Sequence, residues 1–245
     1  MNLTFIDTET TWIEQEDVII QLWLINEVDW KVIQRINSFF SNWERKISLK
    51  SKATHGILED SIKNFPIFSP LTPEYKLINN LSRTTIFVGH NIQFDIGMLA
   101  KSWLKIDRYI DTLQVAKHLM QDEEDEFENS YRQEILKYYL MEKWIVFPDV
   151  KAHDAMGDTQ IVEVIFGYLF ELTKNTFALG KNEEAIDKML ELTQTPILLK
   201  KIRFGKHRWQ TFEQIAQNDP SYLQWLAWTT DDENIRFTCE RWINI

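Results

Sequence analysis

Hydrophobic and polar residues follow a strand pattern in three successive segments at the start of the chain. Leu3 to Glu9 alternates between apolar and polar positions, as does Lys31 to Phe40, and the intervening Asp17 to Asn26 is rich in valine, isoleucine, leucine and tryptophan. A period of two residues and a wealth of β-branched and aromatic side chains are typical of β-strands. Because the joins are short, the pattern predicts an antiparallel meander.

Further along the chain, helical patterns alternate with short strands. A helical segment is predicted after Thr54-His55-Gly56, through about Asn64, and Pro73 fits the first turn of a helix that ends near residue 81. The runs Thr84 to Val88 and Tyr109-Ile110 predict short buried strands. Helices are predicted at about Phe94 to Leu104, Leu113 to Met120 after a cap at Asp111 or Thr112, Tyr131 to Leu140, and Asp154 to Leu172. This order predicts an α/β fold, a mixed β-sheet flanked by helices.

The composition changes after Lys174. A polar segment containing Gly180 is followed by an amphipathic helix near Glu183 to Leu192, then by a basic stretch from Lys200 to Trp209 and a helical, tryptophan-rich end. A length of 245 residues suits one main domain with a small appendage. We therefore predict a first domain at residues 1–175 and a small, mainly helical C-terminal module at residues 176–245.

The net charge of −10 argues against a protein that coats nucleic acid non-specifically. Six of the acids lie in Asp122 to Glu128, which predicts a solvated loop. The single cysteine, Cys239, excludes an intramolecular disulfide and a cysteine-based zinc site. No signal peptide is visible, and the most apolar helical segment, Ile161 to Phe170, is too short to span a bilayer. We predict a cytoplasmic protein without a membrane partner.

Two carboxylates end the first predicted strand. Asp7 and Glu9 lie two positions apart, so they share the face of Leu3 and Phe5. Buried like charges are unfavourable unless a counter-charge is present, and a divalent cation such as Mg²⁺ or Mn²⁺ prefers oxygen ligands of this kind. Taken alone, the spacing is better explained by a strand that simply ends at the surface.

Two further segments carry acids at comparable places. The strand that ends at Gly89 is followed by a Gly-His-Asn turn, and Asp95 falls in the first turn of the next helix, where open α/β sheets place their ligands. Asp158 shares a helical stripe with Val162, Ile165 and Leu169, so it projects from a core-facing side. His153 lies on the loop just before that helix. An ordinary helix cap and a surface histidine are the simpler explanations of each residue in isolation.

Together, in order and spacing, these segments resemble the three exonuclease motifs of the DEDDh (DnaQ-like) family. The matching stretches are Phe5-Ile6-Asp7-Thr8-Glu9-Thr10-Thr11, Gly89-His90-Asn91-Ile92-Gln93-Phe94-Asp95 and His153-Asp154-Ala155-Met156-Gly157-Asp158. Thr54-His55-Gly56-Ile57 and Asp111-Thr112-Leu113 also match landmarks of the family. The resemblance covers about residues 1 to 172 and implies a ribonuclease H-like fold.

The resemblance also implies a mechanism. Two Mg²⁺ ions, for which Mn²⁺ would substitute, would lie about 4 Å apart. Asp7 would bridge both ions, with Glu9 and Asp158 completing one site and Asp95 supporting the other through water. His153 would act as general base toward the attacking water, since its normal pKa near ~6.5 suits that task. The product would be a nucleoside 5′-monophosphate released from a 3′ end.

The terminal nucleotide has its own implied contacts. By resemblance, they are the backbone around Thr10 and the side chains of His90 and Asn91, with Phe94 in the same motif. Trp12 stands where the family usually has glycine, beside the expected nucleotide pocket, and it either stacks on a base or wedges into the core. Substrate preference is the property that this departure affects.

The tail contains the stretches Ile202-Arg203-Phe204-Gly205-Lys206-His207 and Asp219-Pro220-Ser221-Tyr222-Leu223-Gln224-Trp225-Leu226. They resemble the C-terminal segment of bacterial exodeoxyribonuclease X, although Trp209 stands where that segment usually has glycine. Its basic residues, interleaved with aromatic ones, suit contacts to phosphates and bases. The predicted nucleic-acid contacts are Lys200, Lys201, Arg203, Lys206 and Arg208. The alternative is a helical packing or dimerisation module with a solvated basic face.

Three functions remain open at this point. The first is a 3′→5′ exonuclease acting on DNA 3′ ends, and the second is an exoribonuclease related to oligoribonuclease or RNase T. The third is a non-catalytic nucleic-acid-binding subunit of a repair or replication complex, which the intact set of four acids and a histidine argues against. A homodimer, and a role in repair, mismatch excision or salvage, are all compatible with the sequence.

Overall fold

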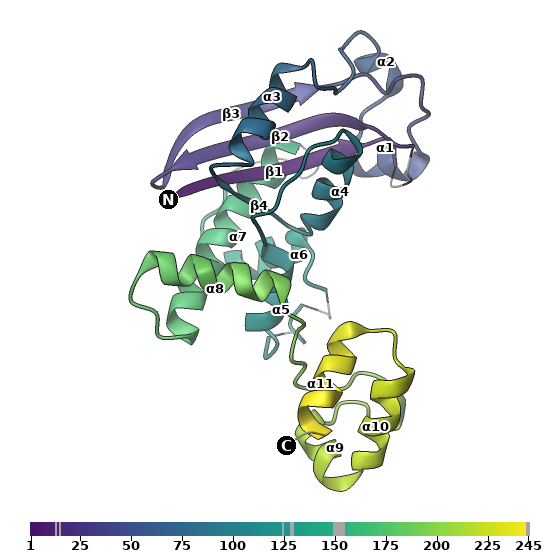
Figure 1. Ribbon diagram of the computed structural model, residues 1–245, viewed down its shortest axis with the longest axis vertical. Coiled ribbons are helices and arrows are strands. Elements are labelled where there is room, and N and C mark those ends of the chain that lie inside the picture. The colour runs from purple at the N-terminus through teal and green to yellow at the C-terminus, as the bar shows by residue number, and fades with distance from the viewer. Residues whose placement is uncertain (13, 15, 124, 128–129, 149–154, 244–245) are drawn as a thin grey trace.

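The computed structural model describes residues 1–12, 14, 16–123, 125–127, 130–148 and 155–243. Within them, five strands form one sheet in the order β3-β2-β1-β4-β5 (Figure 1). The strands are β1 (Asn2–Thr10), β2 (Ile19–Val28), β3 (Lys31–Phe39), β4 (Ile86–Gly89) and β5 (Tyr109–Asp111). The first three pair antiparallel, whereas β4 and β5 continue the sheet in parallel beside β1. The predicted meander and mixed sheet are therefore confirmed.

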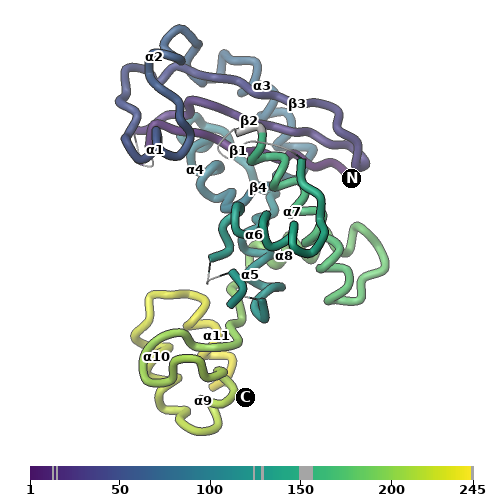
Figure 2. Tube along the Cα trace, turned by 180° about the vertical axis from the view of Figure 1, so that it is seen from behind, coloured from purple at the N-terminus to yellow at the C-terminus, as the bar shows by residue number. Residues whose placement is uncertain are grey.

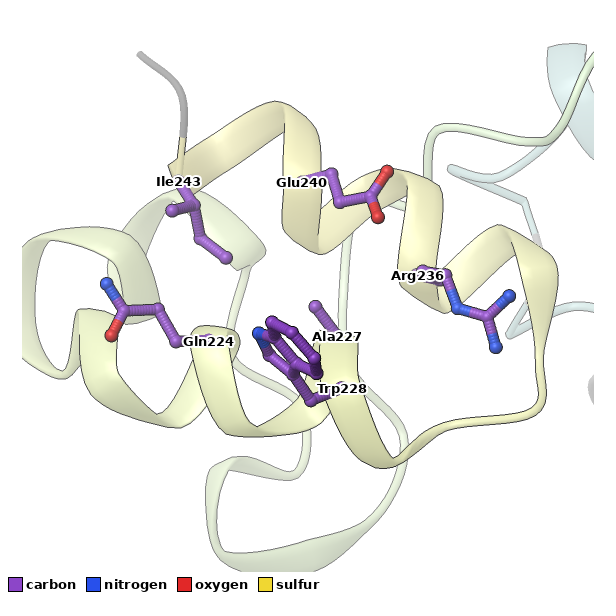
Figure 3. A pocket seen from close by; sticks show the side chains of 6 residues that line it. All are labelled: Gln224, Ala227, Trp228, Arg236, Glu240 and Ile243. Atoms are coloured by element: carbon purple, nitrogen blue, oxygen red, sulfur yellow. The ribbon is translucent and has the colours of Figure 1, made fainter.

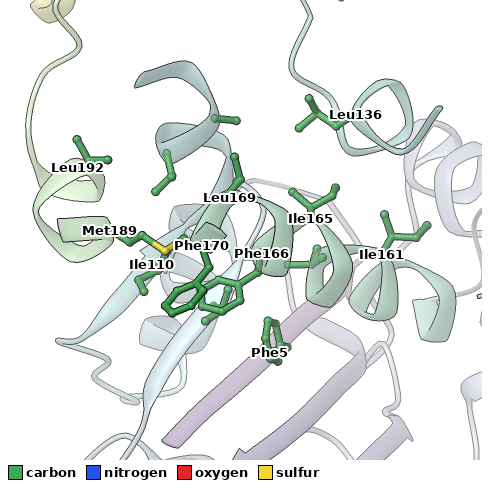
Figure 4. Packing of buried hydrophobic residues seen from close by; sticks show 14 of the residues in the cluster. Phe5, Ile110, Leu136, Ile161, Ile165, Phe166, Leu169, Phe170, Met189 and Leu192 are labelled. Carbon is green, nitrogen blue, oxygen red and sulfur yellow. The ribbon is translucent and has the colours of Figure 1, made fainter. Parts of the chain in front are cut away.

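Helices cover both faces of this sheet. Alternate residues of β1 point to opposite sides, so this strand contributes to the core on each face. Leu3 and Phe5 face a core formed with α5 (Thr112–Leu119), α6 (Gln133–Glu142), α7 (Ala155–Thr176) and α8 (Asn182–Gln194). Figure 4 shows Phe5 beneath Ile161, Ile165 and Phe166 of α7. Ile6 faces the opposite core, which contains residues of α3 (Pro73–Leu81) and α4 (Gln93–Lys101).

A short helix, α2 (Glu59–Ile62), follows Thr54-His55-Gly56 as predicted, whereas the helix before it was not predicted. That helix, α1 (Leu49–His55), ends at His55. The reason is Gly56, whose φ of 71° is left-handed and whose N–H donates to the carbonyl of Lys52. A left-handed glycine at this place terminates a helix, so the Thr-His-Gly motif marks the end of α1.

The last three helices have a core of their own. They are α9 (Phe212–Asn218), α10 (Pro220–Thr229) and α11 (Glu233–Ile243), and they enclose buried residues such as Phe212, Leu223 and Cys239. Figures 1 and 2 both show this group set apart from the sheet, beyond the end of α5. In contrast, α8 contributes Met189 and Leu192 to the core on the sheet. The cores therefore change after α8, later than residue 175, and the two-domain division remains a proposal.

None of the helices that the structure describes is both long and apolar enough to cross a membrane. The longest, α7, contains 22 residues and is amphipathic, with Asp158, Glu163 and Glu171 along it. Its apolar stripe packs on the sheet rather than facing outward. This arrangement places the start of α7 close to the end of β1.

Candidate active site

The end of β1 brings Asp7 and Glu9 onto the face of the sheet that α7 covers. Both follow the alternation that buries Leu3 and Phe5 on that face. Antiparallel pairing with β2 continues through both residues, so their direction is fixed by the sheet. The predicted common orientation of the two carboxylates is thus confirmed, and both side chains are half-buried.

Asp95 reaches the same place from α4. Only glycine fits at position 89, because a Cβ there would lie 2.9 Å from Cγ1 of Ile92 and 3.2 Å from the carbonyl oxygen of Ile6. The close approach of β4 to β1 lets α4 start beside the sheet. The buried Oδ1 of Asp95 then accepts hydrogen bonds from the N–H of Thr8 at 2.8 Å and from its hydroxyl at 2.6 Å. Asp95 is therefore hydrogen-bonded to Thr8, the residue that lies between Asp7 and Glu9 in the sequence.

Asp158 reaches the site from the first turn of α7. The stripe that contains Val162, Ile165 and Leu169 is buried in the core, as the sequence predicts, and Asp158 continues it toward β1. The side-chain amide of Gln133, on α6, donates to the backbone carbonyl of Asp158 at 2.9 Å. This bond from α6 helps to hold the beginning of α7 in place.

The pKa values of these acids record how close they lie to one another. Burial, followed by the charges of Asp95, Glu9 and Asp158, raises the pKa of Asp7 well above its ordinary value. Burial and the charges of Asp158 and Asp95 raise the pKa of Glu9 to about 8. The pKa of Asp95 rises to about 7, chiefly through burial, although the two bonds from Thr8 oppose the rise. Like charges gathered out of water favour protonation or a bound cation.

The donor set fits a divalent metal ion in its chemistry. All four side chains offer hard carboxylate oxygens, which suit Mg²⁺ and Mn²⁺. Within the part of the chain that the structure describes, no group of three or more His, Cys, Asp or Glu side chains is arranged to hold a metal ion as it stands. The four acids therefore interact through their charges without forming a closed set of ligands.

The structure describes the contacts of the other predicted site residues, with one exception. His153 falls outside the described residues. The hydroxyl of Thr10 donates to the carbonyl of Trp12 at 2.8 Å, and the ammonium of Lys50 lies 5.1 Å from the centre of the Trp12 ring. Phe94 is partly buried against the core beneath α4.

His90 and Asn91 follow β4 directly, but they differ in how far they are exposed to solvent. The ring of His90 bonds Thr112 Oγ1 at 3.0 Å and the carbonyl of Tyr131 at 2.8 Å. Burial lowers the pKa of His90 to about 4, so the ring is neutral at physiological pH. Asn91 is exposed and has a left-handed backbone with φ of 63°. Of this pair, Asn91 is the one that presents its side chain to solvent.

Two residues that support the site could not be recognised as such from the sequence. Thr8 anchors Asp95, yet a threonine between two acids looks like an ordinary strand residue. The sequence marks Asp111 as a possible helix cap and as part of a family landmark, but it does not show that the Asp111 carboxylate accepts the N–H of Asn91 at 2.9 Å. Asp111 is the last residue of the buried β5, and Asp95 lies in the first turn of the helix that follows the buried β4.

The basic stretch of the tail is partly neutralised within the chain. Lys200 pairs with Asp122 at 2.6 Å and Arg203 with Asp125 at 3.5 Å, so the acidic loop is not only solvated. Lys206 pairs with Asp219 at 2.6 Å. Lys201 and Arg208 are exposed. These last two are the residues of the predicted set that best suit contact with phosphates.

The C-terminal module also carries a pocket of about 640 Å³ between α10 and α11. Figure 3 shows the indole of Trp228 beside Ala227, with Arg236 and Glu240 on the facing helix. None of its lining residues belongs to the predicted catalytic set. The pocket and the carboxylate cluster therefore have no residue in common.

Comparisons with known proteins agree with this geometry. The model of the Exonuclease family RNase_T matches residues 4–166. Exodeoxyribonuclease 10 of Escherichia coli K12 is 24% identical over 226 residues, which cover 91% of this chain and 90% of that protein. A solved structure of Exonuclease X in complex with 5′ overhanging duplex DNA has a TM-score of 0.56 at 21% identity, covering 78% of this chain and 99% of that one.

A second solved structure is similar over a smaller share of its own length. The zinc-ion-bound form of the E. coli exonuclease I complex with single-stranded DNA has a TM-score of 0.51 at 20% identity. The match covers 71% of this chain and 40% of that one. At such identities the likeness shows the fold alone, and it confirms the expected exonuclease fold of ribonuclease H type.

Proposed function

Because the chain belongs to the Exonuclease (RNase_T) family, we propose that it is a metal-dependent 3′→5′ exodeoxyribonuclease that releases nucleoside 5′-monophosphates from DNA 3′ ends. One observation supports this most strongly: four carboxylates from three separate elements, Asp7, Glu9, Asp95 and Asp158, meet at the end of β1. The names of the relatives, an exodeoxyribonuclease and exonucleases bound to DNA, support DNA as the substrate.

Exonucleases of this family depend on divalent metal ions, and the four carboxylates are the residues that would hold them here. We take Mg²⁺ as the natural ion, with two ions bound and Mn²⁺ able to replace them. Bound ions would lower the pKa of the attacking water and offset the negative charge that develops on the phosphate. Thr8 would keep Asp95 oriented, since both of its donors point at one oxygen of that carboxylate.

The other residues would handle the proton and the nucleotide. His153 would accept the proton of the attacking water, a contribution on the order of 10²–10⁴-fold for a general base. The backbone around Thr10 and the exposed side chain of Asn91 would contact the terminal nucleotide. His90 would act mainly by fixing the turn, because both of its ring nitrogens already have partners in the chain.

The test is digestion of matched DNA and RNA oligonucleotides, single- and double-stranded, labelled at either end, with Mg²⁺ or with a chelator. We expect a 5′-labelled DNA strand to shorten stepwise from its 3′ end and a 3′ label to appear at once as mononucleotide. The chelator should stop both. Preferential digestion of RNA would favour the exoribonuclease, and no digestion of any substrate would contradict the proposal.

A further inference from the structure

The turn between β4 and α4 carries His90 and Asn91, and it is fixed almost entirely from the next strand and helix. Asp111 Oδ1 accepts the N–H of Asn91 at 2.9 Å. The hydroxyl of Thr112 lies 3.1 Å from the carbonyl of Gly89 and 3.0 Å from Nδ1 of His90. Asn91 is therefore bonded to Asp111, and the single proton of the Thr112 hydroxyl is shared between the Gly89 carbonyl and the His90 ring.

Asp111 is itself rigidly placed. It is 1% exposed, and the oxygen that bonds Asn91 also accepts the N–H of Leu113 at 2.9 Å, which caps α5. Its own N–H donates to the hydroxyl of Thr193, on α8, at 3.0 Å. A strand pairing links it to Gly89 as well. Because these contacts hold Asp111 in one position, its carboxylate can fix the position of the turn.

Asn91 needs a bond of this kind because its backbone is left-handed. Residues other than glycine adopt this conformation chiefly where the surroundings hold them in it. The helix that carries Asp95 begins at Gln93, directly after this turn. We propose that Asp111 is a positioning residue of the active site, one that sets Asn91 and the start of α4 without contacting the substrate. This inference rests on the function proposed above.

Two substitutions separate positioning from simple support of the fold. Asp111→Ala removes the acceptor, and we expect kcat/KM on single-stranded DNA to fall on the order of 100-fold, because displacements of about 1 Å have effects of that size. Asp111→Asn keeps an acceptor oxygen of the same shape and should recover most of the activity. Asp219→Ala is the matched control, since Asp219 caps α10 in the same way through the N–H of Tyr222.

A measurement independent of activity completes the test. In Asp111→Ala the amide of Asn91 should exchange with deuterium much faster, whereas that of Phe40, which is bonded to the carbonyl of Ile20, should keep its wild-type rate. Unchanged exchange at Asn91, or equal losses of activity in Asp111→Ala and Asp219→Ala, would overturn the inference. Failure of the proposed function is a different result: the wild type would then degrade no DNA while the exchange difference persisted.

A separate observation concerns the tryptophans. Five of them have a left-handed backbone, with φ between 45° and 74°: Trp30, Trp43, Trp103, Trp144 and Trp209. Their side chains are between 45% and 93% exposed. Positive φ is uncommon outside glycine, asparagine and aspartate, and for a bulky residue it is a true outlier. Half of the ten tryptophans share a conformation that disfavours tryptophan.

The turns around three of these residues are of types in which glycine is the usual occupant. Asp29 and Trp30, both with positive φ, form the two-residue loop between β2 and β3, for which Asp-Gly is a preferred pair. After α4, the N–H of Trp103 bonds Ala100 and that of Leu104 bonds Leu99, which is the Schellman ending of a helix.

The ending of α6 repeats this arrangement. The N–H of Trp144 bonds the carbonyl of Met141, and that of Ile145 bonds the carbonyl of Leu140. In a Schellman ending the left-handed position is occupied by glycine far more often than by any other residue. The chain thus places tryptophan twice at the same glycine position of the same motif.

The five residues do not form a common surface. They lie in the β2–β3 loop, in the segment after β3, at the ends of α4 and α6, and in the C-terminal module. A binding role would therefore need five unrelated explanations. The composition points the same way: the chain has 7 glycines and 10 tryptophans, whereas the average glycine share of about 7% would give roughly 17.

We infer that positions 30, 43, 103, 144 and 209 are glycine positions, and that the protein made by its own cells carries glycine there. A single cause accounts for all five, because one codon, UGA, is translated as tryptophan in some genetic codes and as glycine in others. The buried Trp23, in the middle of β2, has no such conformation and belongs to the core.

Peptide mass spectrometry of the protein from its own cells tests this inference, with glycine expected at the five positions and tryptophan at Trp23. In protein produced with tryptophan at all of them, Trp103→Gly and Trp144→Gly should each raise Tm by roughly 2–4 °C. The control Trp23→Gly should lower it, since it empties a packed site. Tryptophan in the native peptides, or a fall in Tm for the first two variants, would overturn the inference.

Discussion

Carboxylates near the two ends of the chain have opposite electrostatic surroundings, which shift their pKa values in opposite directions. In the C-terminal module, Asp219 is surrounded by donors from the same chain: Lys206 at 2.6 Å, Ser221 at 2.8 Å and His207 at 3.0 Å. These bonds hold the pKa of Asp219 below its ordinary value. At the end of β1, Asp7 and Glu9 meet other acids, and burial and mutual repulsion raise their pKa values.

The difference separates a structural acid from a functional one. Asp219 has its counter-charges within the fold, so it caps α10 and stabilises the module. The acids around Asp7 have the opposite surroundings, since burial and the neighbouring carboxylates all disfavour the charged forms of Asp7 and Glu9. Such a cluster is stable in its charged form only with a partner from outside the chain.

The largest expected effect is that of removing Asp7. Asp7→Ala should abolish hydrolysis of DNA, a loss of more than about 1000-fold, because metal-ion stabilisation supplies several kcal/mol to such reactions. Asp219→Asn is the control and should retain wild-type kcat. The readout is a 5′-labelled oligonucleotide in Mg²⁺, and hydrolysis by Asp7→Ala at the wild-type rate would refute the site.

Replacing His153 should have the next largest effect. His153→Ala should lower kcat by a factor on the order of 10²–10⁴, the range for loss of a general base, while metal affinity stays unchanged. A Mn²⁺ titration of the variant provides the second half of this test. If kcat and metal affinity fell together, His153 would be a structural support or a ligand instead.

The pH dependence of stability should differ between the two regions. In the unfolded chain the acids lose their protons near pH 4, whereas in the folded, metal-free protein Glu9 keeps its proton to about pH 8 and Asp95 to about pH 7. The folded state thus binds more protons between pH 5 and 8, so stability falls as pH rises through this window. Asp219, with a lowered pKa, contributes a constant amount across it.

We therefore expect Tm in a chelator to decrease from pH 5.5 to 8.5, and Mg²⁺ to reduce or remove that decrease by keeping the carboxylates ionised and paired. Scanning calorimetry at several pH values, with and without Mg²⁺, makes the comparison. Asp219→Asn should lower Tm without changing the slope. An identical pH profile with and without Mg²⁺ would argue against a metal site at the end of β1.

The smallest effect should come from the exposed cations of the tail. Replacing Lys201 and Arg208 together by alanine should weaken DNA binding and reduce the slope of log affinity against log salt by roughly 1.4, at about 0.7 for each phosphate contact on a single strand. Lys200→Ala is the control, because that ammonium is paired with Asp122. An unchanged slope in the double variant would favour a packing or dimerisation role for the module.

Local patterns predicted the parts of the site that depend on a single element. The alternation of β1 placed Asp7 and Glu9 on the core-facing side, and the helical stripe with Val162 placed Asp158 there too. Both predictions rest on periodicity, which is a property of the backbone and needs no knowledge of distant contacts. The family resemblance joined them into one site.

Contacts between distant residues could not be predicted in the same way. Thr8 and Asp95 are 87 positions apart, and Lys200 and Asp122 are 78 apart, so no local pattern contains either pair. The same reason applies to α8, whose composition resembles the tail although its apolar face packs against α5 and α7. The helix α1 was not predicted, although Gly56 in a left-handed conformation is a common way for a helix to end.

The most direct test of the central claim is the number of protons released when a divalent ion binds. Calorimetric titration with Mn²⁺ at pH 7, in two buffers with different heats of ionisation, gives that number. Because Glu9 and its neighbours hold protons at this pH, we predict release of roughly one proton or more per protein molecule, and much less for Asp7→Ala. Binding without proton release, or no binding, would contradict the account of the carboxylates as a metal site.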